Sequence, residues 1–160
     1  MSAQQQPDHD DDDFEMEILS ATDFHAALAA QLDVSRRLQV SCAMLLLQVE
    51  YEELYLERYG VEDVNQLRAP FAWLVAQSIR DSDTCGWLYD GCLAVILRIV
   101  SAEETSLVAT RLQKVLARHP VLIGGLNLHL AVQVGGVWYS GLRPMKPEDF
   151  TLQAIQALST

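Results

Sequence analysis

The tetrapeptide Arg80-Asp81-Ser82-Asp83 has an arginine and an acid of the types and at the spacing that suit recognition of an anionic ligand. The guanidinium of Arg80 can donate two N–H groups to a phosphate or to another planar acceptor, and the carboxylate of Asp83 can accept N–H groups. We expect both side chains at a helix end, because residues three apart share one helical face. An exposed ion pair, worth a few tenths of a kcal/mol, explains the same spacing.

A second stretch, WLYDGCLAVIL at residues 87 to 97, predicts two strands joined by a tight turn at Asp90-Gly91. Asp-Gly between apolar runs favours a type I′ turn, which needs a positive φ at both central residues. Cys92 follows the turn. Because no histidine stands beside it in sequence to deprotonate its thiol, we do not expect it to act as a nucleophile.

Metal and cofactor chemistry is not indicated elsewhere in the chain. Neither the cysteines nor the histidines are spaced as metal ligands, and the odd number of cysteines without a CxxC pair is typical of a reduced protein. The residues concerned are Cys42, Cys85, Cys92, His25, His119 and His129. We therefore expect no metal and no cofactor.

Charge is distributed unevenly along the 160 residues, whose formal net charge is −11. Residues 1 to 17 contain seven acidic residues and no basic one, which leaves 11 basic and 15 acidic residues in the rest. A body with an excess of acids does not favour nucleic-acid binding. The acidic start is unlike a signal peptide and no apolar run reaches the roughly 20 residues of a membrane span, so we expect a soluble, cytoplasmic protein.

Hydrophobic periodicity predicts the elements that position these residues. We expect residues 1 to 16 to be a disordered acidic tail and residues 17 to 160 to form one domain. The expected elements are a helix from Thr22 or Asp23 to 38, a strand 42–49, a short helix 50–60, a helix 62–79 with a late start or a kink at Pro70, the hairpin 87–97, a helix 102–118, a strand 126–136 and a helix 147–158. This order indicates a sheet with helices on its faces.

The order and its residues resemble a GGDEF domain, the catalytic module of diguanylate cyclases, over about residues 20 to 158. In that family an Arg-x-x-Asp motif precedes the signature by five residues. Here RDSD (80–83) is followed by TCGWL and then by YDGCL (89–93) at the place of the signature, and VQVGG (132–136) matches a later Ser-Ile-Gly strand. The resemblance implies an α/β (α+β) fold: a central mixed, mainly antiparallel sheet of about five strands with helices on both faces.

The positions that bind metal and nucleotide in that family carry other residues here. They are Gln48 and Glu50 at an Asp-x-Asp-like strand end, Leu56 for an Asn, Asn65 for an Asp, and Tyr89, Asp90, Gly91 and Cys92 within the signature. Joining two GTP molecules needs Mg²⁺, which prefers carboxylate oxygens over the amide of Gln48 or the soft thiol of Cys92. We therefore predict no diguanylate cyclase activity.

The resemblance also implies an effector site, because Arg80 and Asp83 stand where the family binds cyclic di-GMP for inhibition. Arg111, 22 residues after Tyr89, matches a second arginine that the family often adds. The favoured hypothesis is a non-catalytic GGDEF-like signalling domain, with cyclic di-GMP as its effector and an unidentified signalling protein as its partner. One alternative is a pure protein-interaction or dimerisation module, such as a homodimer, without nucleotide. A less favoured one is an active cyclase in which Glu50 and Asp90 replace the usual acids.

Overall fold

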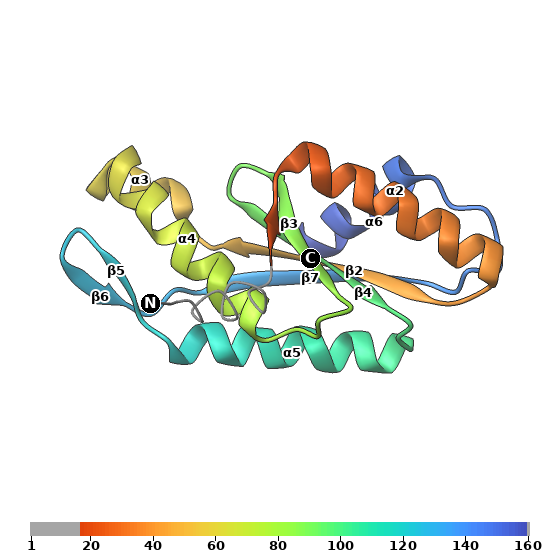
Figure 1. The fold of residues 1–160 in the computed structure, drawn as a ribbon. Coiled ribbons are helices and arrows are strands. Elements are labelled where there is room, and N and C mark those ends of the chain that lie inside the picture. The colour runs from red at the N-terminus through yellow and green to blue at the C-terminus, as the bar shows by residue number, and fades with distance from the viewer. Residues whose placement is uncertain (1–16, 160) are drawn as a thin grey trace, which may run out of the picture.

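The computed structural model describes residues 17 to 159, and the expected acidic tail of residues 1 to 16 lies outside them (Figure 1). The helices are α2 (Ala21–Leu38), α3 (Glu52–Tyr59), α4 (Val61–Gln77), α5 (Ala102–Arg118) and α6 (Pro147–Ser159). The strands are β1 (Ile18–Leu19), β2 (Cys42–Val49), β3 (Thr84–Tyr89), β4 (Cys92–Arg98), β5 (Val121–Ile123), β6 (Leu126–Leu128) and β7 (Val132–Tyr139). None of the helices in this range is long and apolar enough to cross a membrane.

Five strands form one sheet in the order β1-β3-β4-β2-β7. Only the pairing of β1 with β3 is parallel, so the sheet is mixed and mainly antiparallel, as predicted. The apolar run 42–49 becomes β2, whose position between β4 and β7 explains why it reads as buried on both faces. The short strands β5 and β6 form a separate two-stranded hairpin.

Two hydrophobic cores lie on opposite faces of the sheet, and β2 contributes to both. Ala43, Leu45 and Leu47 point into the core under α4 and α5, which includes Phe71 and Leu112. The intervening residues of β2 point into the core under α2 and α6; they are Cys42, Met44 and Leu46. This alternation is the period of two that strand geometry imposes.

Helix bounds follow the predicted ones closely, with corrections at the start of α2 and at Pro70 of α4. Its N-cap is Ser20, whose hydroxyl accepts from the N–H of Asp23, rather than Thr22 or Asp23 as predicted. Pro70 lies inside α4, so the predicted late start is wrong and the helix runs on through the proline. Arg36 and Arg37 occupy the last turn of α2, where they offset the negative end of the helix dipole.

The predicted strand 126–136 is two strands. β6 ends at Leu128 and β7 begins at Val132, because the intervening segment turns so that Leu130 enters the core and His129 Nδ1 reaches the carbonyl oxygen of Ala117 at 2.9 Å. Alternation of apolar residues continues across this break, so the sequence pattern does not reveal it.

The turn at Asp90-Gly91 joins β3 and β4 as predicted, but its predicted type I′ geometry is wrong. Gly91 has a φ of +84°, whereas Asp90 is not in the left-handed region. A bulge between Trp87 and Tyr89 shifts the register of the hairpin. The bulge increases the local right-handed twist of the strands, which a type I′ turn would otherwise accommodate. Positive φ at both central residues occurs instead at Gly124-Gly125, between β5 and β6.

Candidate functional site

The two positions expected to hold metal-binding acids lie side by side in the sheet. Gln48 of β2 pairs directly with Cys92 of β4. Cys92 is fully buried, and burial raises the pKa of its thiol to about 11, while its side chain and that of Tyr89 share a hydrogen bond. A neutral amide beside a buried, protonated thiol does not fit Mg²⁺, which takes hard oxygen ligands.

Gln48 also lines a hollow of about 430 Å³ at the end of β2. Glu50 lines the same hollow, together with Glu52, Glu53 and Leu54 from the start of α3. Among residues 17 to 159, no three His, Cys, Asp or Glu side chains are grouped so that they could hold a metal ion. The structure thus brings Gln48 and Glu50 together without forming a metal centre from described residues.

A second cavity, of about 590 Å³, lies between α4 and the β3–β4 hairpin. Asn65, Asp90 and Gly91 line it, so three of the predicted positions meet there. The remaining polar and aromatic lining residues were not among the predicted site positions; they are Arg68, Trp73 and Trp87. Leu56, by contrast, packs against the core under α4 and α5.

A polar network fills part of this region. Arg68 Nη2 donates to Glu52 Oε1 at 2.9 Å, and Arg68 Nη1 donates to Asn65 Oδ1 at 3.2 Å. A Cβ atom at Gly91 would lie 2.9 Å from Glu52 Oε1, so the carboxylate sits directly against the turn. Arg68 was detectable in sequence as the only base between Arg58 and Arg80, three residues after Asn65.

Arg68 keeps one unused donor. Its Nε is buried and has no hydrogen-bond partner among the described residues. A buried N–H without an acceptor costs free energy, about 1–3 kcal/mol for a typical group. An acceptor atom of a bound molecule placed at this nitrogen would remove that cost.

The Arg80–Asp83 pair is a clamp in a loop, with its acid buried and its arginine half-exposed, so the prediction of a helix end is wrong. α4 ends at Gln77, and residues 80 to 83 form a turn closed by the bond from Asp83 N–H to the Arg80 carbonyl. The Asp83 side chain is 2% exposed and that of Arg80 is 53% exposed. The alternative of an exposed ion pair therefore describes the arginine but not the acid.

The carboxylate of Asp83 accepts four N–H groups. Arg80 donates to it from its backbone N, its Nε and its Nη2 at 3.0, 3.2 and 3.1 Å, and the backbone N–H of Arg98 donates at 3.3 Å. Arg80 Nη2 also donates to the Arg98 carbonyl oxygen at 2.7 Å. The bond to Asp83 raises the pKa of the Arg80 guanidinium.

Arg111 lies near this clamp. It projects from α5 and its Nη2 donates to the carbonyl oxygen of Ser78 at 2.7 Å, just after α4 ends and two residues before Arg80. Its side chain is exposed. The structure thus gathers all three candidate effector residues around the connection between α4 and β3.

Comparisons with known proteins give matches of structure only. No protein-family model matches the chain, and no curated protein matches it in sequence. The GGDEF domain of FimX from Pseudomonas aeruginosa superposes with a TM-score of 0.82 at 12% identity, covering 91% of each chain. The GGDEF domain of DgcB from Caulobacter crescentus, solved in complex with c-di-GMP, gives 0.80 at 10% identity over 90% of this chain and 85% of that one.

A third match is to a longer protein. The diguanylate cyclase SiaD from Pseudomonas aeruginosa, in complex with its activator SiaC, gives a TM-score of 0.82 at 16% identity over 89% of this chain. This chain spans 54% of that one. Taken with the strand order and the paired positions of β2 and β4, these likenesses give the conclusion that the chain has the fold of a GGDEF domain.

Proposed function

We propose that this chain is a non-catalytic signalling domain with the GGDEF fold, acting by binding and not by turnover. The observation that carries the proposal is the cross-strand pair Gln48–Cys92, which supplies an amide and a buried thiol where catalysis needs carboxylates. Loss of one preorganised group costs roughly 10²–10³ in rate, and here several are replaced together.

The network around Arg68 supports the same proposal. Glu52 lies against Gly91 and is tied by Arg68 to Asn65, so the chain's own side chains occupy part of the space beside the turn. Tyr89 adds a ring that is 40% exposed at the signature position.

Incubation with GTP and Mg²⁺ or Mn²⁺, followed by chromatographic separation of the nucleotides, tests the loss of catalysis. We expect no cyclic di-GMP above the level of a boiled sample, while an active diguanylate cyclase in parallel gives product. Product formation by this chain that depends on Glu50 and Asp90 would support the substituted-ligand cyclase and end the proposal.

Cyclic di-GMP is the effector that we propose for the Arg80 region, as the DgcB structures were solved in complex with that nucleotide. The guanidinium groups of Arg80 and Arg111 lie beside the α4–β3 connection and are both accessible to solvent. Each could bind one of the two anionic phosphates of the nucleotide. Because Asp83 is engaged by four N–H groups, we assign ligand contact to the two arginines and the support of Arg80 to Asp83.

Thermal unfolding with and without cyclic di-GMP tests this assignment. At about 100 times the dissociation constant, linkage predicts about 2.7 kcal/mol of stabilisation, a rise of roughly 5–10 °C. We expect the rise in the parent and in Arg37→Ala, a matched exposed arginine, and its loss in Arg111→Ala. Each variant is compared with its own ligand-free midpoint, because each substitution also removes a hydrogen bond of the ligand-free fold. A flat parent would remove the nucleotide from the proposal.

A protein-interaction module without nucleotide is the second candidate, favoured by exposed apolar side chains around the two cavities. Tyr51, Leu54 and Trp73 are 68%, 61% and 55% exposed. Surfaces of this kind mark docking sites. Sedimentation of the parent and of Trp73→Ser over a range of concentrations tests self-association at this surface; a parent dimer that the substitution dissociates supports it, and a monomer in both excludes a homodimer through this face.

A further inference from the structure

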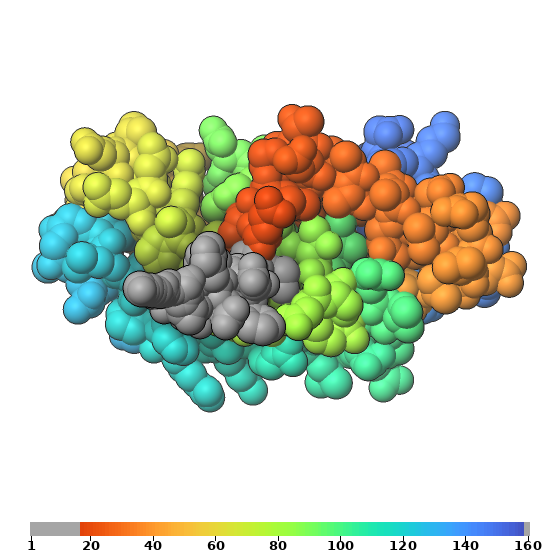
Figure 2. All heavy atoms as spheres, viewed as in Figure 1, coloured from red at the N-terminus to blue at the C-terminus, as the bar shows by residue number. Residues whose placement is uncertain are grey.

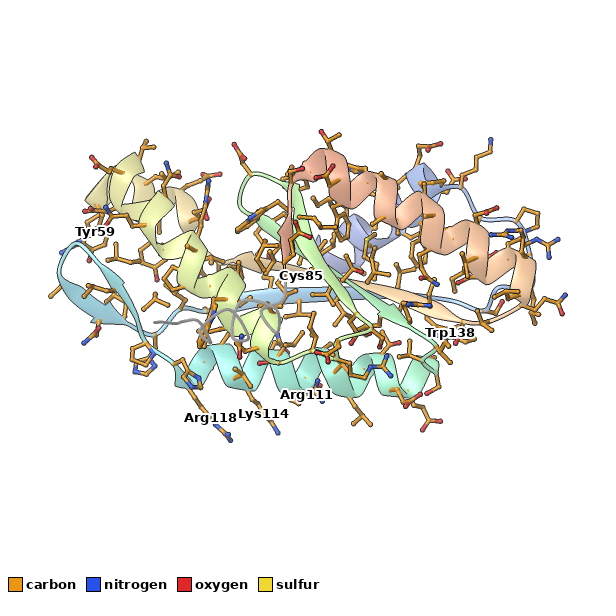
Figure 3. The ribbon with its side chains drawn as sticks, in the orientation of Figure 1. Tyr59, Cys85, Arg111, Lys114, Arg118 and Trp138 are labelled. Atoms are coloured by element: carbon orange, nitrogen blue, oxygen red, sulfur yellow. The ribbon has the colours of Figure 1, made fainter. Side chains whose placement is uncertain are left out.

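The outer side of α5 carries a row of basic residues, Arg111, Lys114 and Arg118. Their spacing of three and four residues places them on one helical face. All three side chains are exposed, and Figure 3 shows Lys114 and Arg118 projecting away from the sheet. We name these three residues the α5 basic face.

Beyond its first turn, α5 has no acidic residue that could pair with these three bases. Between Glu104 and Glu148 the sequence contains no acid and five bases, which are Arg111, Lys114, Arg118, Arg143 and Lys146. The ion pairs formed among residues 17 to 159 are Arg37–Asp33, Arg68–Glu52 and Arg80–Asp83, none of which uses the α5 basic face. A concentrated positive surface therefore stands on a chain whose net charge is −11.

The opposite charge is concentrated just before β1. Residues 8 to 17 include seven acids, with four consecutive aspartates at Asp10 to Asp13. The chain enters the described fold at the edge of the sheet, where β1 contacts both α4 and α2 and Ile18 lines the cavity beside α4. α4 in turn contacts α5 (Figure 1).

The distance to be covered is short for this length of chain. Four to nine residues separate Asp13 and Asp8 from Glu17, enough to span roughly 13–30 Å when extended. Neighbouring helices pack about 8–10 Å apart, so an extended segment of this length is long enough to cover the distance from β1 across α4 to α5.

We propose that the acidic segment of residues 8 to 13 binds the α5 basic face of the same chain. The contact joins carboxylates to Arg111, Lys114 and Arg118 at an exposed surface, so it weakens as salt screens the charges. Arg111 belongs both to this face and to the proposed effector site, so the segment competes with an anionic ligand for that guanidinium. The contact itself does not depend on the proposed function.

Paramagnetic relaxation in the full chain tests the contact. A nitroxide attached at Gln6→Cys labels selectively, because Cys42, Cys85 and Cys92 are fully buried. In about 20 mM NaCl, where the screening length is roughly 20 Å, we expect loss of the amide signals of residues 110 to 118 relative to those of α2. Reduction of the nitroxide restores them, and about 500 mM NaCl, with a screening length of about 4 Å, abolishes the loss.

Charge variants decide whether the effect comes from this pairing. Lys114→Glu with Arg118→Glu, and separately Asp10 to Asp13 changed to Asn with α5 intact, both abolish the signal loss. Arg36→Glu with Arg37→Glu on α2 makes the same change of net charge and leaves it in place. Absence of the loss, its persistence in the α5 variant, or its appearance only between a tagged and an isotope-labelled copy overturns the proposal.

Discussion

At the scale of single residues, Asp83 connects two segments that its sequence context does not relate. Its carboxylate gathers N–H groups from Arg80 at the entry to β3 and from Arg98 at the end of β4. It therefore closes the open end of the hairpin whose other end is the Asp90-Gly91 turn. An acid of this kind is needed for the fold whether or not a ligand binds beside it.

Asp83→Ala and Arg80→Ala should each lower the free energy of unfolding by about 2 kcal/mol, because the first removes the acceptor of four N–H groups and the second leaves the buried Asp83 carboxylate with backbone donors only. The double variant should cost less than the sum, with a coupling of about 1–2 kcal/mol, as expected for directly bonded groups. Urea unfolding of the four proteins measures this cycle. Additive single effects would contradict the clamp geometry.

The buried thiols make a second residue-level prediction. Burial raises the pKa of Cys85 to about 12 and that of Cys92 to about 11, from an ordinary value of 9.0. Above pH 9 the unfolded chain loses these protons while the folded chain keeps them, so the free energy of unfolding falls as pH rises toward 11. The fall is at most about 1.4 kcal/mol per pH unit for each thiol. Urea unfolding at pH 8, 9 and 10 shows this, and Cys85→Ala with Cys92→Ala should flatten the trend.

At the scale of elements, the junction of β7 and α6 depends on a glycine. A Cβ atom at Gly135 would lie 2.4 Å from the backbone N and 2.6 Å from the Cα of Leu158. At Gly136 it would meet only the end of the Leu45 side chain, at 2.8 Å, which can rotate. The two adjacent positions therefore form a matched pair.

Gly135→Ala should destabilise the fold by about 3 kcal/mol, since α6 must move as a unit, and Gly136→Ala by about 1 kcal/mol. Thermal unfolding of the two variants makes the comparison. Equal losses of stability in Gly135→Ala and Gly136→Ala would mean that α6 can shift away from β7 at little cost.

The capping box of α5 gives a smaller effect. Ser101 accepts from the N–H of Glu104 at 3.0 Å, and Glu104 accepts from the N–H of Ser101 at 2.9 Å, which lowers the pKa of Glu104. Ser101→Ala should cost about 1 kcal/mol. The contribution of Glu104 is present above the ordinary carboxyl pKa and is lost as pH falls through its lowered value, so Glu104→Gln should weaken the acid dependence of the unfolding midpoint.

The elements that were predictable are those whose periodicity extends over several turns or over a full buried strand. The helix stripes and the run 42–49 belong to this class. β1 has two residues, Ile18 and Leu19, and carries no periodic signal, while the break at His129 is set by tertiary contacts. The resemblance indicated Gln48 and Cys92 as site positions, but their pairing across β2 and β4 came only from the structure. The Glu52–Arg68–Asn65 network was not predicted, because it joins side chains from two helices that no local pattern relates.

At the scale of the whole molecule, one strand joins two cores. The alternating side chains of β2 enter the core under α4 and α5 and the core under α2 and α6 in turn. Figure 2 shows α3 and the β5–β6 hairpin at one end of the molecule and the orange, later part of α2 at the other. Because β2 cannot leave one core without leaving the other, the two faces should unfold together.

Coincident transitions test this cooperativity. Trp73, Trp87 and Trp138 report on the α4 and α5 side, where Trp87 packs on that core and Trp138 pairs with Ala43. Far-ultraviolet circular dichroism reports on all helices. Urea midpoints from the two signals should agree; an earlier fluorescence transition would mean that the α4 and α5 side unfolds alone.

Pro70 is a position at which α4 lacks one backbone hydrogen bond and should open locally more often than its other turns. The proline has no N–H to donate to the carbonyl of Gln66, and it lies between Arg68 and Trp73, which line the larger cavity. Hydrogen exchange at Ala69 and Phe71 should therefore be faster than in the middle of α2. The turn of α4 that forms the wall of the cavity is then the part of this helix that is least restrained by backbone hydrogen bonds, so this wall should deform before the sheet does.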